Sequence, residues 1–314
     1  MSVFVSNPYN SLSLPIMFTG NPLDRMDAER HNDAREEKWT SDPDARYMGF
    51  TDDKIITDAD KKIKWLTFTE IANFTTGDQI FLGLTPSGHP RFAVAIKDFT
   101  PEEDGPYRLK DLRSLAFAAG KPEKGLAIAA QGKSMLDWHR NHPFCSKCGA
   151  PSELKKMGYE RVCPSCNTSH FPRTDPVVIM LGIHKASDSI LVGRPHNLYE
   201  GVYTALAGFM EPGETIEEAT ARELYEEAGV KVTNVRYIAS QPWPYPSTLM
   251  IGCIADIEDK TLTIDTSELD DARWITRTEA EEIMDGRHKS MAFPPALAIA
   301  RQLIDFWLAE EASS

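Results

Sequence analysis

The sequence predicts a protein of mixed α+β and α/β structure that contains more than one domain. Three observations support this prediction. The chain has 314 residues, a length typical of about two domains, and 41% of them are hydrophobic, which is enough for a sizeable core. Four of the five cysteines fall within one short segment near the middle of the chain. Strand-like runs and helical patterns occur on both sides of that segment.

The part of the chain before the cysteines is expected to form a small α+β unit. Residues 1–35 are rich in turn formers and then charged, so we expect loose structure there. Between about 50 and 100, three strand-like runs are separated by turn signals: KIKWLTF, QIFLGLT and RFAVAIKDF. Two helical patterns follow, YRLKDLRSLAFAAG and GLAIAAQGKSMLDWHRNH. The residues of this unit suggest no chemistry by themselves.

The part of the chain after the cysteines alternates strand-like and helical segments, from VVIMLGIHK to a final helix near PALAIARQLIDFWLAEE. Cys253 lies alone in the apolar run LMIGCIADI, and its simplest interpretation is a small buried hydrophobe. The net charge of −13 argues against broad nonspecific binding to nucleic acid, but a phosphate substrate stays possible if divalent metals supply positive charge. With no basic signal-peptide region and no apolar membrane span, the expected location is cytoplasmic.

The clustered cysteines form two CxxC pairs, Cys145/Cys148 and Cys163/Cys166, separated by 14 residues. Four thiolates brought to one point are the ligands that tetrahedral Zn²⁺ prefers, and a filled set leaves no position for substrate. We therefore expect one structural Zn²⁺ per chain, and the alternative is a pair of disulfides. Residues 141–173 carry five Lys/Arg against two Glu, a local charge of +3 that is weakly suggestive of nucleic-acid binding.

An acidic helix is expected within GFMEPGETIEEATARELYEEAGV, residues 208–230. Thr215 followed three residues later by Glu218 predicts a capping box, and Gly229 predicts the helix end. At ~100° per residue, one face should hold Ala221, Leu224, Tyr225 and Ala228, with Glu223, Glu226 and Glu227 opposite. Arg222 can pair with Glu226, whereas Glu223 and Glu227 lack a basic partner in the helix. Bound divalent cations would explain this arrangement, and the alternative is a solvated acidic face.

A proline-rich stretch follows, Ser240-Gln241-Pro242-Trp243-Pro244-Tyr245-Pro246. Prolines at every second position disfavour helix and predict a stiff extended loop that could hold aromatic rings for stacking. An ordinary connection with its aromatic residues in the core is the alternative.

Residues 208–230 match the Nudix box at every specified position, Gly208-x5-Glu214-x7-Arg222-Glu223-Leu224-x-Glu226-Glu227-x-Gly229-Val230. The sequence thus resembles the Nudix hydrolases, which cleave nucleoside diphosphates linked to another moiety. The resemblance implies a C-terminal α/β/α sandwich and two or three catalytic Mg²⁺ or Mn²⁺ ions. It assigns catalysis to Glu227 first, as ligand or base, then to Glu223 and Glu226, with Arg222 orienting Glu226. The implied metal ligands are the carbonyl of Ala207 and the side chains of Glu223, Glu226, Glu227 and Glu268.

The succession of zinc ribbon, Nudix box and proline-rich motif resembles the NADH pyrophosphatases, over at least residues 140–305. In the family motif a phenylalanine stands where this chain has Tyr245, and a serine where it has Thr248. Phe171 and Phe209 would bracket the nicotinamide. The other implied substrate contacts are Gln241, Pro242, Trp243, Pro244, Tyr245, Pro246, Ser247, Thr248 and Ala300, with Arg113 as a looser match. Relatives are homodimers, so a homodimer is expected here.

The expected organisation is an N-terminal NADH-pyrophosphatase-like domain (1–138), a zinc ribbon (139–172), a Nudix domain (173–308) and a short tail (309–314). The expected activity is hydrolysis of NADH, and of NAD⁺, to nicotinamide mononucleotide and AMP, with a metal-activated water attacking one phosphorus. One alternative keeps the site and changes the substrate to RNA with a 5′ NAD cap. Another is a catalytically silent nucleotide-binding sensor.

Overall fold

The computed structural model describes residues 16–310 of the chain, and these residues fall into two compact units. We call them the N-terminal unit, Met17–Thr174 together with Pro242–Ser247, and the C-terminal unit, which comprises Asp175–Gln241 and the chain from Thr248 onward. The division has one unexpected feature. The proline-rich loop lies in the sequence of the C-terminal unit but packs with the N-terminal unit.

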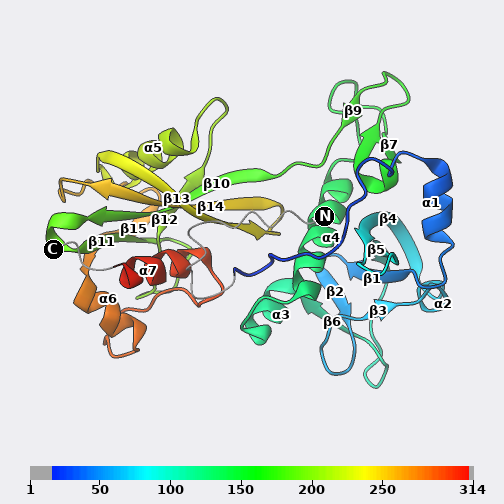
Figure 1. The fold of residues 1–314 in the computed structure, drawn as a ribbon, viewed down its shortest axis with the longest axis horizontal. Helices are drawn as coiled ribbons and strands as arrows, with labels where there is room; N and C mark the ends of the chain where they lie inside the picture. The colour runs from blue at the N-terminus through cyan, green and yellow to red at the C-terminus, as the bar shows by residue number, and fades with distance from the viewer. Residues whose placement is uncertain (1–15, 311–314) are drawn as a thin grey trace. The chain divides into compact units, whose positions relative to one another are not determined.

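The N-terminal unit is built on a six-stranded sheet with the order β4-β5-β1-β2-β6, in which β3 also pairs with β1 (Figure 1). The β1–β5 pairing is parallel and the others are antiparallel. Its strands are β1 Arg46–Thr51, β2 Lys54–Thr57, β3 Trp65–Leu66, β4 Thr75–Leu84, β5 Pro90–Lys97 and β6 Arg108–Asp111. Its helices are α1 Asp33–Thr40, α2 Phe68–Ile71, α3 Leu112–Ala119 and α4 Lys124–Asn141.

The second expected helix is present as α4, whereas the first is helical only as α3, because its residues Arg108–Asp111 form β6. The strand predictions also need correction. The run KIKWLTF forms a strand only at Trp65–Leu66, because the next residue, Thr67, caps α2 in a capping box with Glu70. The β1–β2 hairpin, turned at Asp52 with a positive φ of 49°, was not expected from the sequence. Residues 1–15 lie outside the described part, and within 16–35 the helix α1 begins at Asp33.

The cysteine segment forms a three-stranded sheet that follows α4: β7 Glu153–Lys155, β8 Glu160–Val162 and β9 Ser169–His170, with a 3₁₀ turn η1 at Lys156–Gly158. A buried hydrogen-bond network joins this sheet to α4. The His139 ring lies 2.8 Å from the carbonyl of Gly158, and Arg161 bonds both His139 and Ser152. The ribbon is therefore fixed to the long helix by polar contacts, and Met157 of η1 joins the hydrophobic cluster of the N-terminal unit.

The C-terminal unit contains a second six-stranded sheet with the order β13-β14-β10-β11-β15, in which β12 pairs with β10. The β10–β14 pairing is parallel. Its strands are β10 Asp175–His184, β11 Ser189–Pro195, β12 Leu206–Phe209, β13 Val232–Trp243, β14 Thr248–Ile257 and β15 Leu269–Thr276. Its helices are α5 Ile216–Ala228, α6 Arg277–Met284 and α7 Ile299–Ala309, with a 3₁₀ turn η2 at Lys185–Ser187.

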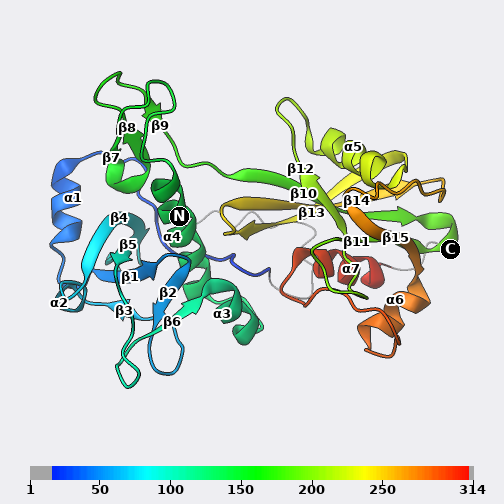
Figure 2. The same ribbon diagram turned by 180° about the vertical axis from the view of Figure 1, so that it is seen from behind.

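Alternate residues of β10 face two different hydrophobic clusters. Val178 and Met180 pack with residues of α5, whereas Ile179 and Leu181 pack with residues of α6 and α7. Figures 1 and 2 show α5 on one face of the sheet and α7 on the other. The expected α/β/α sandwich is confirmed. Cys253 on β14 is 0% exposed, as a small hydrophobe, and burial raises the pKa of its thiol to about 11.

No helix among residues 16–310 combines the length and the apolar character needed to cross a lipid bilayer.

Candidate functional site

The helix α5 carries the acidic residues, and both of its ends are set by the residues that predicted them. The hydroxyl of Thr215 accepts from the backbone N–H of Glu218, and the Glu218 carboxylate accepts from the N–H of Thr215. Gly229 ends the helix in the left-handed region, with φ 73°. These caps fix the register of the helix, and with it the direction of each carboxylate.

The faces of α5 differ from those expected. Tyr225 is 58% exposed, whereas Glu223 and Glu227 are only 8% and 3% exposed. The buried stripe instead contains Ala219, Thr220, Glu223, Leu224, Glu227 and Ala228. Residues at i, i+3, i+4, i+7 and i+8 share one helix face, so Glu223 and Glu227 must follow Leu224 and Ala228 inward. A solvated acidic face is therefore ruled out for these two glutamates, and only Glu226 stays exposed.

Arg222 connects four groups around the site. Its Nε and Nη2 donate to the two carboxylate oxygens of Glu214, at 2.6 and 2.9 Å. Its Nη1 donates to Glu223 at 2.8 Å and to Glu226 at 2.9 Å. Nη2 also donates to the carbonyl of Phe209 at 2.9 Å. The expected pairing with Glu226 is present, but the expectation that Glu223 lacks a basic partner was wrong, because the neighbouring Arg222 reaches it.

The surroundings of the three glutamates shift their pKa values in different directions. The hydrogen bonds from Arg222 lower the pKa of Glu214 to about 2. Burial raises the pKa of Glu223, and Arg222 offsets part of that shift. For Glu227, burial together with the charges of Glu223 and Glu268 raises the pKa to about 8. No hydrogen bond or ion pair is formed by the Glu227 side chain within residues 16–310.

A glycine lets one carboxylate approach the sheet. A Cβ at Gly208 on β12 would lie 1.9 Å from the carboxyl carbon of Glu223 and 2.1 Å from both of its oxygens. Any side chain at that separation would displace the Glu223 carboxylate, so with the carboxylate in place the position has room only for hydrogen. Ala207, the expected carbonyl ligand, precedes Gly208 on the same strand, and Glu268 lies on the turn before β15.

The oxygen donors near α5 have the chemistry that a hard divalent cation prefers, although among residues 16–310 no three of these carboxylates bring oxygens within 4.8 Å of one another. Buried carboxylates are strongly disfavoured without a compensating charge, and Glu227 forms no ion pair within the described part of the chain, residues 16–310. Four further carboxylates, those of Glu223, Glu268, Asp265 and Glu226, are close enough to raise its pKa. Oxygen ligands of this kind are those that Mg²⁺ and Mn²⁺ prefer, and a cation among them would reverse the raised pKa.

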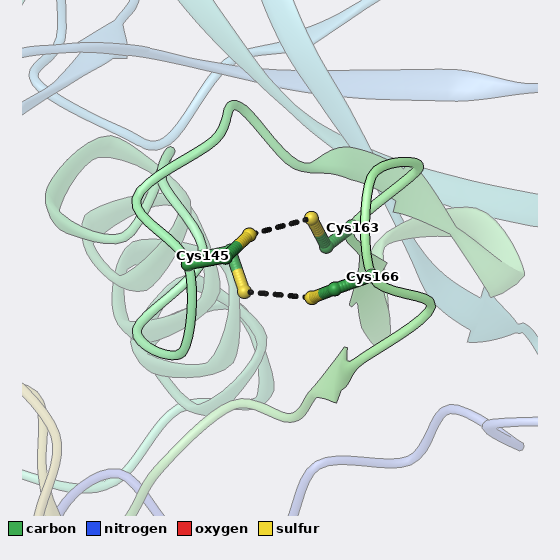
Figure 3. Close-up of side chains that lie close together, drawn as sticks. Cys145, Cys163 and Cys166 are labelled. Carbon is green, nitrogen blue, oxygen red and sulfur yellow. Dashed lines mark hydrogen bonds between the residues drawn. The ribbon is translucent and has the colours of Figure 1, made fainter.

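The four clustered cysteines form a second candidate metal centre (Figure 3). The sulfurs of Cys145 and Cys166 lie 3.6 Å apart, and those of Cys148 and Cys163 lie 3.5 Å apart. A disulfide would need about 2.05 Å, whereas a tetrahedron with Zn–S bonds of ~2.3 Å separates its sulfurs by ~3.8 Å. All four thiols are free, so the disulfide alternative is not adopted. Thr168 donates to Cys166 and lowers the pKa of that thiol to about 6.

The proline-rich loop continues β13 as far as Trp243 and then turns between Pro244 and Ser247. The ring of Trp243 makes edge contacts with Phe18 at 6.0 Å and Tyr245 at 5.2 Å between centroids. Trp243 is partly exposed, so it is neither a core residue nor a free side chain. Its orientation is fixed while part of its surface stays accessible to a flat ligand.

Arg113, the loosest of the expected substrate contacts, lies against this loop. Its guanidinium carbon is 4.6 Å from the centre of the Tyr245 ring and 5.6 Å from that of Trp243. Arg113, Tyr245 and Pro246 together line a pocket of about 450 Å³. The other lining residues belong to the same unit: Asp53, Asp111, Lys133, Asp137, Arg140 and Asn141.

The remaining expected substrate contacts differ in accessibility. Phe171 and Phe209 are 60% and 63% exposed, each in its own unit, and are free to meet a ligand. Gln241 is 1% exposed, and its side chain bonds the carbonyl of Leu297 and the N–H of Ile299. Ala300, on the first turn of α7, is 3% exposed. The Gln241 side chain therefore points inward and fixes the start of α7 through hydrogen bonds.

Sequence reasoning assigned no role to Glu214, Gly208 or Lys133. Glu214 and Gly208 are fixed positions of the box, but their spacing alone does not say what they touch. Lys133 had a local signal, because it stands four residues before Asp137 on α4, and both side chains are buried. A lysine buried in such a helix indicates a specific partner.

Comparisons with known proteins cover most of the chain. Residues 44–138 match a model described as an NADH pyrophosphatase-like rudimentary NUDIX domain. Residues 140–171 match the NADH pyrophosphatase zinc ribbon domain, and residues 173–293 match the NUDIX domain. The four cysteines lie inside the second match and the α5 carboxylates inside the third.

Two relatives illustrate the similarity. The chain is 34% identical over 251 residues to the NAD-capped RNA hydrolase NudC of Mycobacterium bovis, an alignment that covers 77% of this chain and 79% of that protein. It is 45% identical over 195 residues to the NAD-capped RNA hydrolase NUDT12 of Homo sapiens, covering 59% of this chain. The aligned part spans only 42% of the length of the human protein.

Proposed function

This chain belongs to the NADH pyrophosphatase family of zinc-ribbon Nudix hydrolases, and on that premise we propose that it cleaves the pyrophosphate of NADH and NAD⁺. The products are nicotinamide mononucleotide and AMP. The observation that carries the proposal is the buried carboxylate of Glu227, which has no partner within the described residues and lies among the charges of Glu223, Glu268 and Asp265.

The residues of the site have different roles in the proposed reaction. Glu223, Glu226 and Glu227, with Glu268 and the carbonyl of Ala207, would hold divalent cations. When bound, these cations supply charge neutralisation for the pyrophosphate and activation of the attacking water. Arg222 fixes the rotamers of Glu223 and Glu226. A water oxygen bonds to one phosphorus, the bond between that phosphorus and the bridging oxygen breaks, the bridging oxygen leaves with the other phosphate, and the proton of the water is released to solvent.

Selection of the nicotinamide end is assigned to aromatic residues, because the carboxylates can act on any suitable pyrophosphate. We propose Trp243, Phe171 and Phe209 for this role, with Arg113 and the other residues of the 241–248 loop as further contacts, and with Gln241 and Ala300, whose side chains are buried, contributing through the backbone. The partly exposed ring of Trp243 is already held by Phe18 and Tyr245, so little ordering entropy is lost on stacking.

The identity of the catalytic metal, the oligomeric state and the cellular location are part of the same proposal. We propose Mg²⁺ or Mn²⁺ as the catalytic metal, two or three ions per site, a homodimer, and a cytoplasmic location. The oxygen-only donor set supports the metal choice, since softer metals prefer nitrogen or sulfur ligands. The four thiolates hold a structural zinc that takes no part in the reaction.

A second candidate function is removal of the 5′ NAD cap from RNA by the same site. Two observations favour it: both relatives named above are called NAD-capped RNA hydrolases, and the zinc ribbon carries a local charge of +3 in a chain of −13. Each phosphate contact made by such a ribbon would add to the salt dependence of the reaction.

One experiment tests both candidates. Free NADH and an NAD-capped RNA are compared as substrates across a salt series, with Mg²⁺ or Mn²⁺ added or withheld, and the products are identified. We expect metal-dependent formation of nicotinamide mononucleotide and AMP from NADH, with little effect of salt. Cleavage of the RNA alone, falling steeply with salt, would favour the second candidate. Binding of NADH without turnover of either substrate would contradict both and indicate a silent sensor.

A further inference from the structure

We propose that helix α4 of the N-terminal unit holds the proline-rich loop in its binding conformation, which makes Lys133 and Ser134 positioning residues for the substrate. The inference rests on the proposed function, in which that loop contacts the nicotinamide. It gives the N-terminal unit a role that its sequence alone does not suggest.

The first observation is that Pro242–Ser247 packs as part of the N-terminal unit, although the strands on either side, β13 and β14, belong to the C-terminal sheet. A loop between two sheet strands ordinarily takes its conformation from the turn itself. Here three prolines, at 242, 244 and 246, have no backbone N–H to donate, so the loop can form few internal hydrogen bonds. The loop forms one internal backbone hydrogen bond, from the N–H of Tyr245 to the carbonyl of Trp243 at 2.8 Å, and groups outside it supply further contacts that fix its conformation.

Ser134 supplies one of those groups. Its hydroxyl donates to the carbonyl of Pro246 at 3.1 Å, across 112 residues of sequence. The next loop residue, Ser247, donates from its own hydroxyl to the carbonyl of Arg173 at 3.0 Å. The C-terminal half of the loop is thus tied to two separate segments of the N-terminal unit.

Lys133 supplies a second contact from the adjacent position on α4. It is 5% exposed, and its ammonium nitrogen lies 5.4 Å from the centre of the Tyr245 ring. A cation over an aromatic face at this distance is attracted by the ring quadrupole, more strongly when water is excluded. Arg113 contacts the same ring from α3 at 4.6 Å. Two cations therefore hold Tyr245, the loop residue next to the proline that Ser134 binds.

An ion cluster keeps Lys133 in place, and in it Lys133 and Asp137 are buried whereas Asp53 and Arg140 are exposed. The Lys133 ammonium donates to Asp137 at 2.5 Å, and Asp137 also accepts from Arg140 at 2.8 Å. Asp53, at the β1–β2 turn, lies 3.5 Å from Lys133 and 3.4 Å from Arg140. Buried ion pairs add little net stability compared with apolar residues of the same size, but they fix the geometry of the groups that they join. The cluster therefore directs a charged group toward Tyr245.

The competing explanation is that Lys133 and Ser134 only stabilise the N-terminal unit. Hydrogen exchange in the full-length, zinc-loaded protein separates the two explanations, because it reports on the loop apart from the rest of the unit. The variants are Ser134→Ala and Lys133→Met, and Lys124→Met, at the exposed start of the same helix, is the matched control.

We expect both variants to speed amide exchange in residues 241–249 by about 5-fold or more, the factor expected for one ordinary hydrogen bond. Exchange in β1, β5 and α5 should stay unchanged, and Lys124→Met should match wild type everywhere. In the same variants the KM for NADH should rise several-fold with kcat within about 2-fold, since the carboxylates are untouched.

Unchanged exchange in the loop of both variants would overturn the inference. So would faster exchange spread evenly over Met17–Thr174, which would indicate general destabilisation. Failure of the proposed function has a different signature. In that case the wild-type protein would not cleave NADH, while exchange in the loop would still respond to both variants.

Discussion

The two units of this chain share one topology and differ in one segment. The two sheets have the same strand order when β1 to β6 are matched in turn with β10 to β15. Each sheet also contains a parallel pairing at the same position, β1–β5 in the N-terminal unit and β10–β14 in the C-terminal unit. Two helices follow the last strand in each unit. Between the third and fourth strands, the N-terminal unit has the four-residue helix α2 and the C-terminal unit has the 13-residue helix α5.

Because of this difference, the C-terminal unit carries the acidic site and the N-terminal unit does not. The acidic residue of α2, Glu70, serves the capping box with Thr67 and pairs with Lys64, so its charge is satisfied. The third strand of the N-terminal sheet carries Trp65 and Leu66, where the C-terminal strand carries Gly208. The fold alone therefore does not produce the site. It needs a long acidic helix and a glycine that lets a carboxylate reach the sheet.

The largest effect is expected for the charge of Glu227. Glu227→Gln keeps the size of the side chain and removes a ligand or base, so kcat for NADH should fall by about 10²-fold or more with the fold intact. The matched change in the other unit, Glu70→Gln, should leave kcat unchanged, because glutamine also completes a capping box. Steady-state kinetics with circular dichroism on both variants makes the comparison. Glu227 would lose its assigned role if a folded Glu227→Gln protein kept more than about a tenth of the activity.

The glycine that admits Glu223 can be tested next. Gly208→Ala places a methyl group where the structure leaves 1.9 Å to the carboxyl carbon, so the carboxylate must move. A displacement of ~1 Å in a catalytic group can cost ~10²-fold, and we expect kcat to fall by ~10- to 10²-fold. Kinetics and the melting temperature are measured together. Normal kcat in this variant would mean that Glu223 need not lie against β12.

The role of the proline-rich loop can be tested by replacing Trp243. Stacking contributes ~1–3 kcal/mol per base in nucleic-acid sites, so Trp243→Ala should lower kcat/KM for NADH by ~5- to 150-fold. ADP-ribose keeps the pyrophosphate but has no nicotinamide, and its hydrolysis should barely change. Equal losses for the two substrates would remove Trp243 from nicotinamide recognition. An unchanged rate with NADH would remove the loop from the specificity argument.

The smallest expected effect is on the thermal stability of the metal-free protein. The pKa of Glu227 is raised from 4.5 to about 8, so folding favours its protonated form. The stability that this group contributes is present below about pH 4.5 and is lost as the pH rises through about 8. In metal-free protein, Glu227→Gln should change the melting temperature little near pH 5 and raise it by at least ~2–4 °C near pH 9. A difference between variant and wild type that is the same at both pH values would contradict the raised pKa.

How far the sequence predicts this molecule depends on the range of the interactions. The caps of α5 are local, so Thr215, Glu218 and Gly229 marked its ends correctly. The burial of Glu223 and Glu227 was missed because the helical period was assigned to the apolar residues alone. The β1–β2 hairpin was missed because four consecutive residues of β1 are buried, which leaves no alternation to detect.

The attachment of the loop is the part that the sequence does not reveal. Ser134 and Pro246 are 112 residues apart, and neither residue type indicates the other. The one available signal was the Lys133–Asp137 pair, whose spacing is also that of any exposed helical ion pair. Burial distinguishes the two cases, and burial depends on the tertiary fold.

The central claim is that divalent cations bind to the carboxylates of α5 and not to the equivalent segment of the N-terminal unit. Titration of the zinc-loaded protein with Mn²⁺, followed by electron paramagnetic resonance, measures this directly. We predict that wild type and Glu70→Gln bind Mn²⁺ alike, and that a Glu223→Gln/Glu227→Gln double variant binds it at least ~10-fold more weakly, since both charged ligands are gone. Undiminished Mn²⁺ binding by the folded double variant would contradict the account.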